Sequence, residues 1–373
     1  MVEQRVRMRD HNPPGSAGSD LLPRVAGTLL RLPYEPWRFG DSIAFEAMIR
    51  ASEVLDDASY AGFGLGFARG WEATRDGYQP LDLTAPGRAL VELADRYDDD
   101  QALQAARALA DYLARRRRLQ GVFVTWERSP LRQPHGGQPL GATDQALLED
   151  PGAGVFLDCL HFDPPFFAAL ATVTGDPDWG QLAVEQAAAY IQLLRDATTG
   201  LFHHFYLERT GRCYIPDWGR GQGWALLGLL DVIDSLPAHS GIGPVRAAAI
   251  GLAEAMADRQ RADGHWEIAV DHPGSGDETS TAAFMATGLA RAARLVPDPS
   301  RSRRLRDCAD RARLATIASI DEAGVLTGVS AAVWASTVES HYHHVPRGFT
   351  VAWGQGPALL ALSQPAADSD GAA

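Results

Sequence analysis

Helices of two kinds alternate along this chain, and their order limits the folds that it can adopt. Apolar residues recur at helical spacing over residues 42–55, 60–72, 86–97, 101–117, 155–174, 178–195, 220–235, 244–261, 278–295, 302–319 and 353–363. Four times, a helix that is apolar on almost every side precedes one with a charged face, at 86/101, 160/178, 220/244 and 278/302. The first kind must be buried, whereas the second faces solvent on one side. We therefore predict an all-α fold, an (α/α)6 barrel in which six helical hairpins form an inner and an outer ring, with an irregular superhelix as the alternative.

Stretches with the alternation typical of strands are short and isolated. They lie at residues 121–127, 200–208, 265–271 and 324–334, and none begins the regular strand–helix alternation of a parallel sheet. We expect them to form short β segments in the loops of the barrel. The length of 373 residues suits one large domain or two ordinary ones. We expect a disordered leader at 1–30, a single barrel domain at 31–364 and a flexible tail at 365–373.

The charge and the cysteine content exclude several classes of protein. The net charge is −13 and all 34 basic residues are arginine, so the chain lacks the basic surface of a nucleic-acid-binding protein. No window is long and apolar enough to span a bilayer, and the first residues lack the apolar core of a secretory signal. Three scattered cysteines show neither metal-site spacing nor a disulfide framework, which fits a reducing compartment. We expect a cytoplasmic monomer or homodimer without cofactor, nucleic-acid partner or membrane partner.

The segment WGRGQGW, residues 218–224, opens one of the apolar helices with large side chains at every second position. The glycines between them permit close approach of the backbone. The indoles of Trp218 and Trp224, together with the guanidinium of Arg220, suit a ring-shaped ligand with apolar faces and an anionic edge. A sugar acid fits this description. Alternatively, the tryptophans belong to the core and Arg220 neutralises a nearby carboxylate.

The segment VFLDCLHFDPPFF, residues 155–167, places Asp158 inside a strongly apolar run. A poorly hydrated carboxyl group favours its neutral, protonated form, which is the condition for a general acid. The alternative is that Asp158 caps the helix that follows. We expect Asp163, which precedes Pro164, to be a turn or cap residue, and His161 to be a core histidine, with ligand or proton shuttle as the alternative.

Three further segments carry polar candidates. Asp82 stands just before another apolar helix, slightly early for a cap, which allows a role in the cavity of a barrel. His203 and His204 point to opposite sides of an extended segment, so we expect one of them to face that cavity. The segment HYHHV, residues 341–345, resembles a metal site in composition, but it lacks the carboxylate or cysteine company of a typical site. We therefore predict no bound metal.

Taken together, these segments resemble the unsaturated rhamnogalacturonyl hydrolases of glycoside hydrolase family 105, which are related to the unsaturated glucuronyl hydrolases of family 88. The resemblance runs from about Trp37 to Ser363 and keeps the order of its pieces: W-x-F-x-x-S at 37–42, LDLTAPGRALVELADRYDDD, VFLDCLHFDPPFFA, TGLFHHFY, WGRGQGW, DGHWEIAVDHPGSGDETSTAAF and WGQGPALLAL. The chain departs from the family pattern around the expected pocket, at Phe39, Leu83, Phe156, His161 and Phe162. These departures bear on which substrate is used.

The resemblance implies a glycoside hydrolase that removes a 4,5-unsaturated uronic acid from the non-reducing end of lyase-generated oligosaccharides. The family does so by hydrating the double bond, with Asp158 as proton donor and then as base, supported by Asp82. The resemblance also implies that the substrate-binding residues are Trp37, Phe39, His204, Trp218, Arg220 and Trp224. The alternatives are an (α/α)6 glycosidase or epimerase acting on saturated sugars, and an inactive carbohydrate-binding relative.

Overall fold

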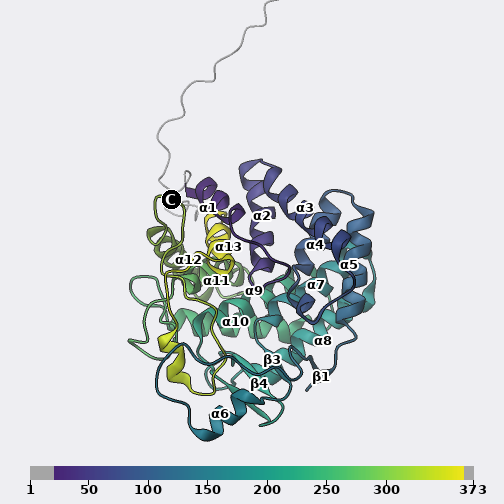
Figure 1. Cartoon of the computed structure of the whole chain (residues 1–373). Coiled ribbons are helices and arrows are strands. Elements are labelled where there is room, and N and C mark those ends of the chain that lie inside the picture. The colour runs from purple at the N-terminus through teal and green to yellow at the C-terminus, as the bar shows by residue number, and fades with distance from the viewer. Residues whose placement is uncertain (1–20, 365–373) are drawn as a thin grey trace, which may run out of the picture.

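The computed structural model describes residues 21–364, and its helices form two concentric rings (Figure 1). The inner ring consists of α2 (Asp41–Leu55), α4 (Gly87–Arg96), α7 (Cys159–Thr174), α9 (Gly219–Ser235), α11 (Thr279–Ala293) and α13 (Ala352–Leu362). Each of these helices contacts the next one, and α13 contacts α2, so the ring is closed. The predicted (α/α)6 barrel is confirmed.

The outer ring consists of α3 (Ser59–Thr74), α5 (Asp100–Leu113), α8 (Pro177–Leu194), α10 (Ile242–Asp258), α12 (Pro299–Ala318) and α1 (Leu21–Leu30). The two rings differ in burial as their sequences predict. In the inner helix α9, every residue from Gly219 to Ile233 is buried. In the outer helix α5, only Ala106, Leu109, Ala110 and Leu113 are buried. The apolar stripe of an outer helix therefore packs on the inner ring while its charged face meets solvent.

The sixth hairpin joins helices from distant parts of the chain. Helix α1 packs on α13 and α2 and buries Leu22, Val25 and Leu29. The prediction of a disordered leader at 1–30 is therefore wrong for residues 21–30, because their apolar stripe completes the outer ring. The expected disorder at 1–20 and the expected tail at 365–373 lie outside the described residues.

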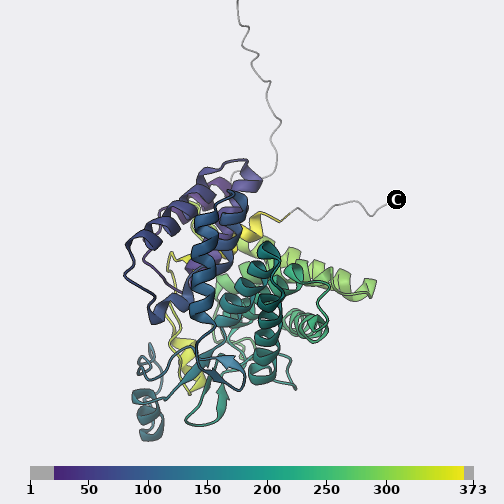
Figure 2. The same ribbon diagram turned by 90° about the vertical axis from the view of Figure 1, so that its right-hand side faces the viewer.

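Short β segments occupy the loops at one end of the barrel. Strand β1 (Arg118–Leu119) pairs with β2 (Val122–Phe123), and β3 (Gly154–Phe156), β4 (Phe205–Leu207) and β5 (Arg212–Tyr214) form an antiparallel sheet in that order. Segments 265–271 and 324–334 form only isolated bridges. Two views show β3, β4, helix α6 (Ala142–Glu149) and the yellow segment with the 3-10 helix η2 (Glu339–His344) together at this end (Figures 1 and 2).

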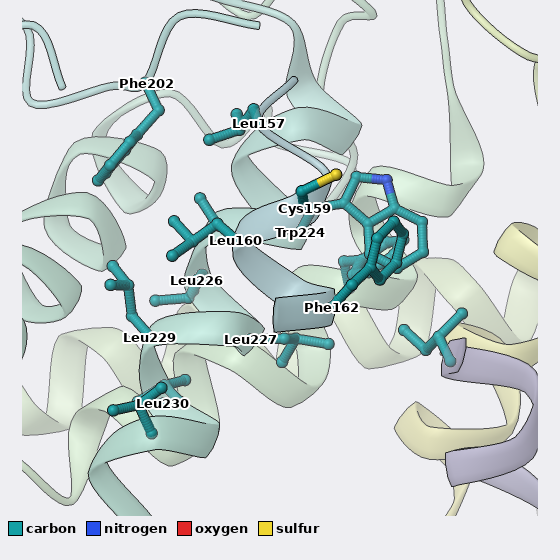
Figure 3. Packing of buried hydrophobic residues seen from close by; sticks show 14 of the residues in the cluster. Leu157, Cys159, Leu160, Phe162, Phe202, Trp224, Leu226, Leu227, Leu229 and Leu230 are labelled. Carbon is teal, nitrogen blue, oxygen red and sulfur yellow. The ribbon is translucent and has the colours of Figure 1, made fainter. Parts of the chain in front are cut away.

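Close packing of α7 on α9 fixes the middle of the inner ring. Leu160 and Phe162 of α7 lie against Trp224 and the leucines of α9 (Figure 3). Gly228 allows this approach, because a Cβ at this position would lie 2.4 Å from the carbonyl oxygen of Leu160. None of the helices in the described part of the chain combines the length and the apolar character needed to cross a membrane.

Candidate active site

A cavity of about 420 Å³ opens at the end of the barrel where the inner helices begin. The N-terminal ends of helices α2, α4, α7 and α9, or the residues just before them, line this cavity. The cavity wall includes Phe39 before α2, Leu83 in the 3-10 helix η1 (Pro80–Thr84), Asp158 before α7, Trp218 before α9, and His204 with loop residues Trp126, Arg132 and Trp334.

Asp158 is the carboxylate of this cavity. It occupies the position before α7, but its side chain accepts no capping hydrogen bond, so the carboxyl group stays free for other partners. The neighbouring Cys159 is buried, and its burial raises the pKa of the thiol. Cys159 is therefore an unreactive, neutral thiol, whereas Asp158 faces the cavity as predicted.

His204 links Asp158 to a residue that the sequence did not reveal. Its Nε2 lies 3.6 Å from Oδ2 of Asp158, and its Nδ1 lies 2.5 Å from the hydroxyl of Tyr342. Burial raises the pKa of Tyr342 well above its ordinary value, so the phenol is neutral. When Tyr342 donates to Nδ1, the proton of a neutral imidazole lies on Nε2, towards Asp158. Tyr342 belongs to the HYHHV segment, which was considered only for metal binding by its histidines.

The four large residues of WGRGQGW have different roles. Trp218 lines the cavity and packs against His204, with ring centroids 4.3 Å apart and ring planes inclined by 49°. Gln222 bonds both the N–H and the carbonyl of Phe202, each at 2.8 Å, and so holds the segment that leads to His204. A Cβ at Gly221 would lie 2.6 Å from the Trp218 ring, so glycine permits this position of the indole.

Arg220 is a buried structural residue rather than a wall residue of the described cavity. Its Nη1 lies 3.3 Å from Glu278 and donates to the hydroxyl of Ser330, and its Nη2 donates to the carbonyl of Ala331 at 3.0 Å. Arg220 is expected to contact the sugar, but it is not among the described wall residues, and Glu278 neutralises it inside the protein. The alternative of a buried arginine–carboxylate pair is correct, and the pair holds the loop that continues into wall residues 332–335.

The two other expected aromatic contacts also belong to the core. Trp224 is fully buried against Phe162 and Phe284, and Trp37 is buried against Trp71. Neither is found among the described residues of the cavity wall. Phe39 does line the cavity, where it stacks on Trp353 with centroids 4.5 Å apart. The sequence pattern could not separate these cases, because an aromatic residue near a helix start packs inward or outward equally well.

Asp82 is a capping residue in this structure. Its carboxylate accepts a hydrogen bond of 2.6 Å from the N–H of Gln79 and so closes η1. Burial raises the pKa of Asp82, against the opposing effects of this hydrogen bond and of Arg75. Leu83 lines the cavity, while Asp82 is not among the described wall residues. The expected support of Asp158 by Asp82 is therefore not visible in the geometry.

Two polar residues of α7 lie away from the cavity. Asp163 is buried within the helix and pairs with Arg116 at 2.6 Å, so it is not the turn or cap residue that we expected. His161 is fully buried between Glu46 and Asp231, at 3.5 and 3.9 Å, as a core histidine. Neither is positioned to meet a ligand in the cavity.

The positive charge of the described cavity wall comes from Arg132. This arginine is the single arginine among the described wall residues, and its guanidinium lies 4.6 Å from the ring centroid of Trp334. His135 also stacks on Trp334, with ring centroids 5.4 Å apart. No sequence motif marks Arg132, because its loop and that of Trp334 are about two hundred positions apart and meet only in the fold. The cavity thus combines one carboxylate, one imidazole, one guanidinium and several aromatic faces.

Comparisons with known proteins agree with this arrangement. The model of the family described as Glycosyl Hydrolase Family 88 matches residues 27–366. The unsaturated rhamnogalacturonyl hydrolase YesR of Bacillus subtilis is 22% identical over 334 residues, which cover 88% of this chain and 89% of that protein. The solved structure of a possible GH105 member from Klebsiella pneumoniae superposes with a TM-score of 0.76 at 17% identity, covering 96% of this chain and 94% of that one.

The unsaturated glucuronyl hydrolase of Bacillus sp. GL1 has the same fold. Its structure matches with a TM-score of 0.63 at 19% identity, covering 92% of this chain and 94% of that one. The family match spans most of the described residues, including every wall of the cavity. The chain is therefore a glycosidase that belongs to glycosyl hydrolase family 88.

Proposed function

We propose that this protein removes a 4,5-unsaturated uronic acid from the non-reducing end of oligosaccharides by hydrating its double bond. The observation that carries the proposal is that Asp158 is the single carboxylate among the described wall residues of the cavity. Direct displacement at an anomeric carbon generally requires two carboxylates at a set separation. Hydration of a double bond needs one group that first donates a proton and then accepts one.

In the first step, protonated Asp158 gives its proton to C4, and positive charge develops at C5 and the ring oxygen. The Asp158 carboxylate then takes a proton from a water molecule that attacks C5, which restores the acid. The resulting hemiketal opens, and the hemiacetal left at C1 releases the rest of the oligosaccharide. The net reaction consumes one water molecule and breaks one glycosidic bond.

The other wall residues match the shape and charge of a uronate. Trp218 offers an aromatic face next to His204, which suits stacking against a sugar ring. Arg132 offers a guanidinium to the carboxylate of the sugar, and such pairs are strong because both partners are charged. His204 lies within 3.6 Å of Asp158, where its Nε2 proton stabilises the carboxylate formed after the first step.

The test follows the ultraviolet absorbance of the conjugated double bond. The protein is mixed with unsaturated disaccharides that lyases release from rhamnogalacturonan, pectin, glucuronan and glycosaminoglycans. We expect the absorbance to fall with at least one of them and to stay constant with Asp158→Asn. Folded protein that leaves the whole panel unchanged, or an Asp158→Asn variant with full activity, contradicts the proposal. Activity on saturated glycans alone would instead indicate a conventional glycosidase.

A further inference from the structure

Three side chains of the types that bind metals in proteins meet next to the active site but outside the cavity. Asp217 precedes Trp218, His272 lies in the loop between α10 and α11, and Glu339 begins η2. One ligand atom of each lies within 4.8 Å of the others. The Nε2 of His272 lies 3.6 Å from Oδ2 of Asp217 and contacts Oε1 of Glu339. Three separate parts of the chain therefore bring an imidazole and two carboxylates to one point.

The carboxylate of Asp217 is buried without a positively charged arginine partner among the described residues. Its side chain is 2% exposed, and neither carboxyl oxygen has a hydrogen-bond partner elsewhere in the described chain. A carboxylate that is buried without a partner is costly, so this position favours a cation or a proton.

A second trio of the same composition in the barrel differs because arginine side chains neutralise its carboxylates. Glu46, His161 and Asp231 also lie within ligand distance of one another. Arg88, however, lies 3.1 Å from Glu46 and 3.3 Å from Asp231, and Arg291 lies 2.7 Å from Asp231. Two guanidinium groups already neutralise that trio. No arginine forms such an ion pair with Asp217 or Glu339 among the residues that the structure describes.

We propose that Asp217, His272 and Glu339 bind a divalent transition-metal cation, for which Zn²⁺ is the best match. An imidazole combined with carboxylates suits Zn²⁺, whereas Ca²⁺ and Mg²⁺ prefer sites made of oxygen alone. His343 lies near the trio, with its ring centroid 5.6 Å from that of His272 and its Nε2 without a hydrogen-bond partner, but it is not one of the side chains that share the 4.8 Å cluster. The sequence does not reveal this trio, because Asp217 and His272 lie far along the chain from Glu339, which stands just before HYHHV.

The position of the site gives the cation a structural role. Glu339 shares η2 with Tyr342, which contacts His204. Asp217 is the neighbour of Trp218, whose ring packs against that of His204. A cation held by both segments fixes the two side chains that orient this histidine.

The test measures metal content and needs no substrate. The full chain is stripped with a chelator, dialysed against Zn²⁺ and freed of unbound metal by gel filtration, and its zinc is determined by mass spectrometry. We expect one Zn²⁺ per chain. Calorimetric titration with Zn²⁺ is expected to show at least a tenfold loss of affinity in Asp217→Asn and in His272→Gln. Unchanged circular dichroism shows that the variants are folded, and Glu339→Gln provides a third variant at a partly exposed residue.

His344→Gln is the matched control, because this exposed histidine lies in η2 but outside the trio. We expect it to bind Zn²⁺ as the unmodified protein does. Absence of bound zinc in the unmodified protein, or equal affinity in Asp217→Asn, overturns the proposal. Loss of zinc in His344→Gln but not in His272→Gln also overturns it, since the exposed His344 would then be a ligand.

Discussion

The hydroxyl of Tyr342 lies 2.5 Å from Nδ1 of His204, while the opposite ring nitrogen faces Asp158. This contact determines which imidazole nitrogen carries the proton and how the ring is turned. In Tyr342→Phe the imidazole keeps its contact with Trp218 but loses the hydroxyl that orients it. We expect kcat to fall about 10- to 100-fold with little change in KM, in line with the loss of groups that orient a functional histidine.

Steady-state kinetics with the best unsaturated disaccharide checks this prediction, together with the dependence of kcat on pH. Tyr214→Phe is the control, because the Tyr214 hydroxyl bonds only Thr210 in the described structure, outside the cavity. Equal kcat values in Tyr342→Phe and the unmodified protein would show that His204 needs no orienting partner.

Arg132 is expected to determine the affinity for an anionic sugar. Replacing it by alanine removes the guanidinium of the cavity wall, and hydrogen bonds to charged groups contribute about 1.5–3 kcal/mol. We therefore expect KM to rise by one to two orders of magnitude in Arg132→Ala. The control is Arg128→Ala, since Arg128 is exposed in the same loop but is not among the described wall residues. Similar KM values in both variants would mean that another group binds the carboxylate.

Arg220 and Glu278 are expected to affect stability rather than substrate binding. Arg220→Met leaves the fully buried Glu278 without its partner, and breaking a buried pair in this way costs about 3–5 kcal/mol. Denaturant unfolding should show this loss, and the double variant Arg220→Met/Glu278→Gln should recover a large part of it. A folded Arg220→Met protein of normal stability but high KM would instead place Arg220 at the substrate.

Gly228 is expected to tolerate no side chain. The Cβ of Gly228→Ala would lie 2.4 Å from the backbone oxygen of Leu160, so α7 and α9 must move apart, at a cost of about 1–3 kcal/mol. Gly243→Ala is the matched control in α10, where a Cβ meets nothing within 4 Å, and there the higher helix propensity of alanine should stabilise the protein slightly. Thermal unfolding of both variants measures the difference.

Asp217 links stability to pH in protein stripped of metal. Its pKa rises from 3.8 to about 6 on folding, so the folded state binds the proton more tightly than the unfolded state. Ionisation of Asp217 therefore destabilises the fold progressively as the pH rises from about 4 to 6, and fully above 6. We expect Asp217→Asn to gain about 1–3 kcal/mol of unfolding free energy at pH 7 and no advantage below pH 4. Denaturant unfolding at several pH values checks the sign, and a gain that is the same at pH 3.5 and pH 7 would contradict it.

Local sequence patterns were sufficient for the ring of helices. The inner helices α4, α7, α9 and α11 were recognisable by apolar residues on almost every side. The outer helices that follow them, α5, α8, α10 and α12, were recognisable by a charged face. Helix α1 was missed because its ten residues follow a Pro/Gly/Ser-rich stretch and their partner α13 lies at the other end of the barrel. No local pattern records such a partner.

The candidate site was predictable only in part for the same reason. Asp158 stood out because a carboxylate in an apolar run needs an explanation, and Trp218 and His204 were placed correctly at the cavity. The burial of Arg220 away from the cavity wall was not predictable, because its partners Glu278 and Ser330 are 58 and 110 positions away. The direction in which a guanidinium points depends on such distant partners, and a single sequence does not contain them.

The pairing of α1 with α13 also has a consequence for how the protein is made. The hydroxyl of Thr28 donates to the carbonyl of Ala323, 295 positions later. The first described helix can therefore complete its packing on α13 only after nearly the whole polypeptide has been synthesised. On a ribosome, five hairpins can assemble in order while α1 still exposes its leucines. Closing contacts of such long range are slow to form, and a nascent chain at this stage presents an apolar helix to chaperones until the last turn of the ring emerges.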